Sequence, residues 1–443
     1  MTVYALSSGP GISGIAVIRV SGSKTEEIIL SLTNGSLPKT KEATLKKIIN
    51  PKNGELIDEG LVIFFKRPNS YTGEDMAEFH VHGSKAVVQE VLTVLEGFDD
   101  CRLAEPGEFT KIAFQNNKIN LLKAESIGDL IAAETELQRK QALRIMSGDS
   151  SKRYNFWRDE LIKILADVEA RIDFPEEDIP DNLSENIKTK CLKIKNEMQG
   201  ILDDNKTGEI IREGFKIAII GPPNVGKSSL LNYLSRREVA IVSEKAGTTR
   251  DVIETHLDLE GIQVIISDTA GIRDTSDEIE KKGVKLAVSR AEDADLLIIM
   301  LDPKNLNFKG FLNEKLDGNS ILVVNKSDLG IENLQKLNFK VNPIIISIKE
   351  NYNVDKVIEA IKYKLKKQFL KSSDILITRS RHRLHLKECC KHLEVFLEKK
   401  NNNEFDLAAE DLRLSIRHLG TIVGKVDVEE ILGSIFENFC IGK

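Results

Sequence analysis

The sequence predicts a multidomain α/β protein in which an α/β domain is inserted into a discontinuous helical domain, behind a small α+β domain at the N-terminus. Between about residues 215 and 369, short continuous apolar runs alternate with helical stretches, which is typical of a buried and mainly parallel sheet. No proline occurs between Pro106 and Pro175 or after Pro343, so both stretches can form long helices. Near the N-terminus three runs indicate strands: GIAVIRVSG, LVIFFKRP and MAEFHVHG.

These patterns divide the chain into four segments. Residues 1–118 form the α+β domain, 119–211 the first half of the helical domain, 212–371 the inserted domain and 372–443 the second helical half. An amphipathic pattern continues almost to the last residue, so we expect the tail SIFENFCIGK to pack against another part of the protein. The apolar residues at helical spacing in this region are Val428, Ile431, Leu432, Ile435 and Phe439.

The composition limits the possible partners and compartments. The 443 residues carry a net charge of −6, which argues against a globally basic nucleic-acid-binding protein and leaves only local patches. The best patch covers residues 362–383, although solvated helix faces explain these charges equally well. The five cysteines are scattered without metal-ligand spacing, and we recognise neither a signal peptide nor a membrane span. We expect a cytoplasmic protein that does not enter a membrane.

A phosphate-binding loop lies between a predicted strand and a predicted helix of the inserted domain. The strand FKIAII precedes GPPNVGKSS (221–229) and the helix SLLNYLSRR follows, which is the context that a P-loop requires. The glycines allow backbone N–H groups to approach phosphates, and the helix N-terminus adds positive potential. Lys227 would reach the β- and γ-phosphates, and Ser228 would bind Mg²⁺. The expected contacts of this loop are Asn224, Val225, Gly226, Lys227, Ser228 and Ser229.

Three further motifs follow in the order of a guanine-nucleotide site. DTAG ends one strand, which would place its aspartate near the metal and its glycine amide near the γ-phosphate. NKSD ends another, and Asp328 is an acceptor-only carboxylate that matches the two donors of guanine and would penalise adenine. The last motif, SIK, would close over the base. Together they predict a GTPase, with contacts from Asp268, Thr269, Ala270, Gly271, Asn325, Lys326, Asp328, Ser347, Ile348 and Lys349.

The position after DTAG holds Ile272, where Ras-type GTPases carry the glutamine that orients the attacking water. An isoleucine can neither donate nor accept a hydrogen bond, so another group must do this. Glu280 is the nearest plausible carboxylate, although the residues alone favour a solvated charge on an exposed helix turn.

Motifs along the whole chain resemble one family. GPPNVGKSS, EKAGTTRD and DTAG in the insertion, YTGEDMAEFHVHG and PGEFTKIAF before it, and the terminal CIGK are similar to the MnmE (TrmE) family of bacterial tRNA-modification GTPases. The resemblance implies a folate-binding-like N-terminal domain, an all-α helical domain and an inserted Ras-like P-loop GTPase domain.

The resemblance also implies a K⁺ ion beside the nucleotide and G domains that dimerise across it. The K⁺ ligands would be Asn224, Ser243, Lys245 and Thr248, while Thr249 would join Ser228 on Mg²⁺. Glu280 matches the water-orienting glutamate of the family, which reverses the preference stated above. The loop that contains the K⁺ ligands would contact GTP through Ser243, Glu244, Lys245, Ala246, Gly247, Thr248 and Thr249.

For the N-terminal domain the resemblance implies a homodimer that binds a tetrahydrofolate derivative, in the 5-formyl or 5,10-methylene form. The matching residues are Arg19, Glu78, Lys118 and the terminal Lys443, and the modification-essential cysteine matches Cys440. A flavoprotein partner, MnmG, would supply FAD in a heterotetramer or larger complex. The pair would add a carboxymethylaminomethyl or aminomethyl group to C5 of the wobble uridine of certain tRNAs.

Three departures from the family pattern surround the expected folate region: Ser84, Glu105 and Lys111. Two other readings of the chain were weighed. A regulatory GTPase switch of the ribosome-assembly type explains the inserted domain but leaves the N-terminal domain and the tail without a role. A prenyl anchor at Cys440 fits poorly, because Lys443 is a poor final residue and an acidic helix precedes the motif.

Overall fold

The chain forms two compact units in the computed structural model. One comprises Met1–Ile131, Ile145–Ile179 and Glu398–Lys443, and the other comprises Ala132–Arg144 and Pro180–Leu397. The structure describes residues 1–173, 182–236, 240–241, 254–268, 292–303, 319–330, 341–369, 375–399, 405–426, 432, 435–436 and 439–442.

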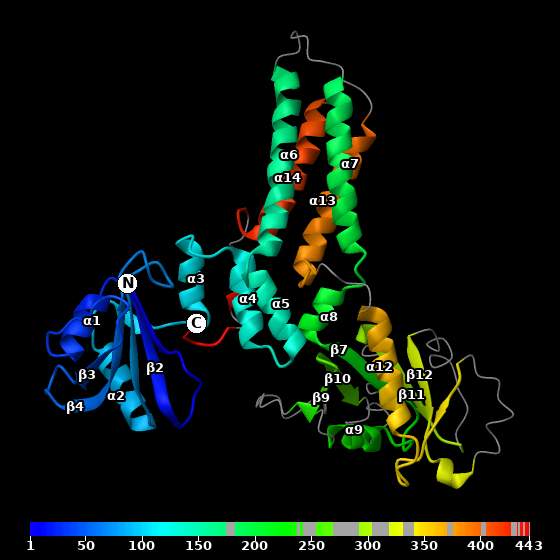
Figure 1. Cartoon of the computed structure of the whole chain (residues 1–443), viewed down its shortest axis with the longest axis horizontal. Coiled ribbons are helices and arrows are strands. Elements are labelled where there is room, and N and C mark those ends of the chain that lie inside the picture. Colours follow the sequence, from blue (N-terminus) through cyan, green and yellow to red (C-terminus); the bar gives the residue numbers. More distant parts are fainter. Residues whose placement is uncertain are drawn as a thin grey trace, which may run out of the picture. The chain divides into compact units, whose positions relative to one another are not determined.

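The N-terminal part of the first unit is built on a six-stranded sheet with the order β3-β4-β5-β2-β1-β6 (Figure 1). All neighbouring strands are antiparallel except β1 and β6, which are parallel. The three strand-like runs of the sequence correspond to β2, β4 and β5, so the predicted α+β fold is confirmed. The strands are β1 (Thr2–Leu6), β2 (Ser13–Gly22), β3 (Thr44–Ile49), β4 (Leu56–Phe65), β5 (Met76–Gly83) and β6 (Cys101–Leu103).

The two faces of this sheet carry different side chains because successive residues of a strand alternate. Helices α1 (Thr25–Leu32) and α2 (Lys85–Glu96) share a core with Ile18 of β2 and Phe79 of β5. Their sequence neighbours Arg19 and Glu78 therefore lie on the opposite face. Helix α3 (Glu108–Gln115) contributes Phe109 to a second core with side chains of β1.

The helical part of the first unit consists of α4 (Leu121–Ile131), α6 (Asp149–Asp173) and α14 (Phe405–Val423). α14 packs along α6 (Figure 1). The C-terminal tail packs on α4: Leu432, Ile435 and Phe436 are buried in one cluster with Leu121 and Ala124. The expectation that the tail is held against another part of the chain is thus met for its described residues.

The second unit contains α7 (Asn182–Leu202), α8 (Thr207–Glu213), α13 (Ser380–Glu398) and most of α5 (Glu136–Met146). Arg383 of α13 is buried, with its guanidinium donating to Glu209 at 2.7 Å and to Asp204 at 2.6 Å. The sequence placed Arg383 within a basic stretch that was one candidate for nucleic-acid contact. The structure overturns this for Arg383, because its charge is used inside the protein.

The inserted domain has a seven-stranded sheet with the order β13-β12-β11-β7-β10-β9-β8, in which β8 and β9 are antiparallel to their neighbours and the other pairs are parallel. The predicted mainly parallel sheet is confirmed. The strands are β7 (Phe215–Ile220), β8 (Ala240–Ile241), β9 (Glu254–Leu259), β10 (Ile262–Asp268), β11 (Leu296–Leu301), β12 (Ser320–Val324) and β13 (Ile344–Ile345).

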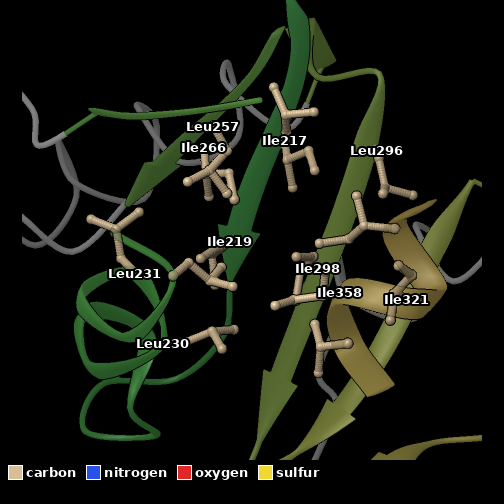
Figure 2. Close-up of a cluster of buried hydrophobic side chains, with 14 of the residues drawn as sticks. Ile217, Ile219, Leu230, Leu231, Leu257, Ile266, Leu296, Ile298, Ile321 and Ile358 are labelled. Carbon is tan, nitrogen blue, oxygen red and sulfur yellow. The ribbon is translucent and has the colours of Figure 1, made fainter. Parts of the chain in front are cut away.

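Apolar side chains cover both faces of the central strands, which explains the continuous apolar runs of the sequence. On one face, α9 (Lys227–Ser235) and α12 (Asp355–Phe369) pack against Ile217, Ile298 and Ile321 (Figure 2). The other face holds a separate cluster that includes Ile299 and Leu322. Among the described residues, none of the helices is long and apolar enough to cross a bilayer.

Candidate nucleotide site and the C-terminal tail

The phosphate-binding loop lies between β7 and α9, as the sequence predicted. Gly221 has φ +154°, and a Cβ there would lie 2.1 Å from the carbonyl oxygen of Met300, so only glycine fits. Lys227 is buried at the start of α9, and its ammonium donates to the carbonyls of Gly221 at 2.9 Å and Pro222 at 3.0 Å. Ser228 and Ser229 are exposed at the same helix N-terminus, where amides and the helix dipole favour anions.

Asn325 joins this loop to the segment expected at the base. Its Nδ2 donates to the carbonyl of Val225 at 2.8 Å, and its Oδ1 accepts from the amide of Ile348 at 3.2 Å. Gly226 has φ +102°, and a Cβ there would lie 2.4 Å from Asn325 Nδ2, so the glycine is required for this close approach. The buried asparagine therefore fixes the distance between the phosphate loop and the base-binding segment.

The two neighbouring residues of NKSD also have defined partners. Lys326 donates from Nζ to the carbonyl of Asn224 at 2.5 Å and pairs with Asp302 at 3.3 Å. Ser347, which is fully buried, donates from Oγ to Oδ1 of Asp328 at 2.8 Å. This bond orients the Asp328 carboxylate that the sequence assigned to guanine. Lys349 is exposed at the end of the same segment.

These motifs meet at one edge of the sheet because each follows the carboxyl end of a parallel strand. The backbone of Asp268 pairs with Ile219, one residue before the end of β7, which places the start of DTAG beside the phosphate loop. The remaining predicted residues lie outside the described part of the chain: Ser243, Glu244, Lys245, Ala246, Gly247, Thr248, Thr249, Thr269, Ala270, Gly271, Glu280 and Lys443. Within the described part there is no group of three acidic, histidine or cysteine side chains that could hold a metal.

The N-terminal sheet brings together two of the residues assigned to folate. Arg19 and Glu78 are opposite each other on β2 and β5 and form an ion pair at 2.8 Å. Burial alone would raise the pKa of Glu78, but the hydrogen bond and charge of Arg19, with help from His80 at 3.3 Å, hold this pKa below its ordinary value. The guanidinium of Arg19 also lies 5.6 Å from the ring centres of both Tyr71 and Phe109.

The tail reaches the same cluster. The carbonyl of Gly442 accepts from Ser7 Oγ at 2.9 Å and from Arg19 Nη1 at 3.4 Å. Ile441 forms a β-bridge with Pro106, just before α3. Cys440 is exposed, and its carbonyl accepts from the amide of Gly107 at 3.4 Å. The tail thus contacts the edge of a site whose polar groups come from residues more than 400 positions away in the sequence.

The other residues of the expected folate region have local roles. Lys118 donates from Nζ to the carbonyl of Pro68 at 2.8 Å. Ser84, one of the three departures, is the N-cap of α2 and accepts from the amide of Val87 at 3.2 Å. Glu105 is exposed, and its amide donates to the Glu108 carboxylate at 2.8 Å. The sequence analysis did not assign a role to His80, whose position two residues after Glu78 on one strand face was the available signal.

A buried P-loop lysine and an oriented NKSD carboxylate at the carboxyl edge of a parallel sheet define a P-loop GTPase. Family models extend this class to the whole chain: the MnmE helical domain matches residues 121–440, and the N-terminus of the GTP-binding protein TrmE matches residues 2–118. The chain belongs to the MnmE (TrmE) family.

Individual relatives agree with this assignment. The protein named tRNA modification GTPase MnmE from Pelagibacter ubique (strain HTCC1062) is 60% identical over 443 residues, with 100% of both chains covered. The protein of the same name from Rickettsia akari (strain Hartford) is 45% identical over 449 residues, again with 100% of both chains covered. Among solved structures, Era from Aquifex aeolicus bound to GDP·AlF4⁻ covers 42% of this chain and 68% of its own, with 25% identity and a TM-score of 0.28, which is too low to carry an argument.

Proposed function

We propose that this protein is a K⁺-dependent GTPase that acts with an FAD-containing partner, MnmG, on tRNA. The reaction adds a carboxymethylaminomethyl or aminomethyl group to C5 of the wobble uridine, with a tetrahydrofolate derivative as the one-carbon donor. Membership of the MnmE family, at 60% identity over the full length of a relative named for tRNA modification, supports this proposal. The observation that carries it is the contact of the tail with Arg19, because it joins the terminal motif to the N-terminal domain.

The nucleotide site divides its work among groups of different chemistry. Lys227 neutralises the β- and γ-phosphates, while Asp328 selects guanine. Ser228 and Thr249 supply hydroxyl ligands to Mg²⁺, which suits a hard cation that prefers oxygen. Asn224, Ser243, Lys245 and Thr248 hold K⁺, which adds positive charge beside the phosphates. Glu280 orients the attacking water, since Ile272 cannot do so.

The folate proposal rests on the polar cluster of the N-terminal sheet. Glu78 can accept from the amino-pyrimidinone edge of a pterin, and Arg19, Lys118 and Lys443 can pair with the glutamate of the folate. Tyr71 and Phe109 add flat apolar surface beside the Arg19 guanidinium, which fits an aromatic ligand. Cys440 lies at the edge of this site and serves the modification step.

We further propose that the four segments 1–118, 119–211, 212–371 and 372–443 act as the dimerising folate domain, the two helical halves and the G domain. A regulatory switch without modification chemistry is the alternative. It accounts for the nucleotide site, but it gives no role to the contacts of Gly442 with Ser7 and Arg19.

Two experiments test the proposal at separate sites. GTP hydrolysis by the purified protein should be much faster in K⁺ than in Na⁺, and Glu280→Ala should slow hydrolysis while GTP binding is retained. Equal rates in both salts would contradict the K⁺ assignment. In cells that lack their own family member, this chain should restore the wobble-uridine modification and Lys227→Ala should not, as read by mass spectrometry of tRNA nucleosides.

A further inference from the structure

Helix α5 belongs by sequence to the helical segment but by contacts to the unit that contains the nucleotide site. Residues 132–144 leave the first unit after Ile131 and return to it at Ile145. Between these points α5 contacts α8 and the hairpin formed by β9 and β10. No family motif falls on this helix, and the proposed function assigns it no role.

The start of α5 is fixed by a capping box. Thr135 Oγ1 accepts from the amide of Gln138, and Gln138 Oε1 accepts from the amides of Thr135 at 3.1 Å and Glu134 at 2.8 Å. Gln138 Nε2 donates to Gln263 Oε1 at 2.8 Å and to the carbonyl of Arg212 at 3.3 Å. All four hydrogen-bonding positions of this amide are used, so its orientation is determined.

The partner on the hairpin is equally constrained. Gln263 is 7% exposed, accepts from Gln138 and donates from Nε2 to the Glu134 carboxylate. His256 Nδ1 lies 3.5 Å from the same carboxylate and 3.3 Å from Gln263 Nε2. We name Glu134, Gln138, His256 and Gln263 the glutamine cluster. It lies on the face of the hairpin opposite to the core side chains Leu257 and Val264.

Apolar contacts and turn geometry stiffen this joint. Leu137 packs against the core of the inserted domain and lies 3.4 Å from the position that a Cβ on Gly261 would take. The hairpin turn consists of Glu260 and Gly261 alone, both with positive φ, which is the tight turn that matches the twist of paired strands. Gln141 adds a bond from Nε2 to the carbonyl of Gly208 at 2.8 Å.

The hairpin is directly connected to both variable parts of the nucleotide site. β9 begins at Glu254, shortly after Thr249, and β10 ends at Asp268, the first residue of DTAG. From Gln263 to Asp268 a strand extends about 17 Å. At its other end α5 is linked through residues 132–135 to α4, and Gly128 of α4 lies against the ring of Phe439 in the tail.

We propose that the glutamine cluster couples the nucleotide state of the GTPase site to the C-terminal tail. A rigid hairpin whose two ends carry nucleotide-binding segments moves with them, and the glutamine cluster passes this displacement to α5 and, through the chain, to α4. Gln138 is a positioning residue, because it contacts neither the nucleotide segments nor the tail. The inference needs only GTP binding and is independent of the proposed tRNA chemistry.

The test places an environment-sensitive maleimide fluorophore on Cys440 of the full-length chain. Cys440 is exposed, Cys101 is partly buried and is replaced by serine, and the remaining three cysteines are buried. The fluorescence of the GDP complex is compared with that of the complex with a non-hydrolysable GTP analogue. The variant is Gln138→Leu with Gln263→Leu, since removing both partners of a buried bond leaves no unpaired amide between them. Gln199→Leu, an exposed glutamine of α7, is the control.

We expect a fluorescence difference between the two complexes in the parent and the control, and a reduction of at least about fivefold in the double variant, the low end of typical coupling factors. Nucleotide affinity and hydrolysis should stay within about twofold of the parent. An undiminished difference in the double variant, or no difference in the parent, would overturn the proposal. Loss of nucleotide binding in the double variant would also contradict it, because the cluster would then support the site itself rather than its coupling.

Discussion

Gly442 offers a direct way to release the tail while leaving the nucleotide site untouched. Its φ is +93°, and a Cβ added there would lie 2.4 Å from the carbonyl oxygen of Leu6. The left-handed backbone costs an L-residue about 1–2 kcal/mol. A clash with a backbone atom cannot be relieved by a rotamer change, so the tail must also give up the hydrogen bond from Ser7, worth about 1 kcal/mol.

The substitution Gly442→Ala should therefore destabilise the local contact of the tail by about 2–3 kcal/mol, which corresponds to an increase in local opening of roughly 30–150-fold. Hydrogen exchange by mass spectrometry measures this opening in the peptide that carries residues 439–442 and at Gly107, whose amide donates to Cys440. Gly14→Ala is the matched control, since nothing lies within 4 Å of its Cβ position. Unchanged exchange in Gly442→Ala would refute the reasoning.

Three further predictions follow from buried charges and thiols. Arg383→Met should lower the free energy of unfolding by about 3–5 kcal/mol in urea titrations, because it leaves two buried carboxylates without their partner. The lowered pKa of Glu78 predicts that its pair with Arg19 stabilises the fold fully above pH 4.5, its ordinary value, and that this contribution is lost as the pH falls through the lowered pKa. Urea unfolding of Glu78→Gln beside the parent should show a constant difference from about pH 5 to 7 and a shrinking one at lower pH. Burial raises the pKa of Cys191 to about 12, so a thiol reagent at neutral pH should modify exposed Cys440 long before Cys191; peptide mapping that finds the reverse order would contradict this burial.

The inserted domain could be predicted closely from the sequence because its evidence is local. A strand buried on both faces must be apolar throughout, and β11 is buried at every position. The phosphate loop, NKSD and SIK each follow such a strand, so parallel topology alone brings them to one edge. The structure added the bonds of Asn325 that tie the motifs together, which depend on side chains 100 residues apart.

Contacts between distant polar residues could not be predicted in this way. Gln138 lies in TELQRKQ, a polar sequence that is typical of an exposed helix, and its partner Gln263 is 125 residues away. The pairing of Arg19 with Glu78 depends on the register of two strands, which their sequences do not specify. Ser84 departs from the family pattern, and only the structure shows that it caps α2.

The central claim is that the tail belongs to a modification site in the N-terminal domain that is chemically separate from GTP hydrolysis. The most direct test compares Cys440→Ser with Cys191→Ser, a buried thiol in α7, in cells that lack their own family member. Mass spectrometry of tRNA nucleosides should show the wobble-uridine modification lost with Cys440→Ser and kept with Cys191→Ser, while both purified proteins hydrolyse GTP at the parental rate. Normal modification with Cys440→Ser would contradict the account.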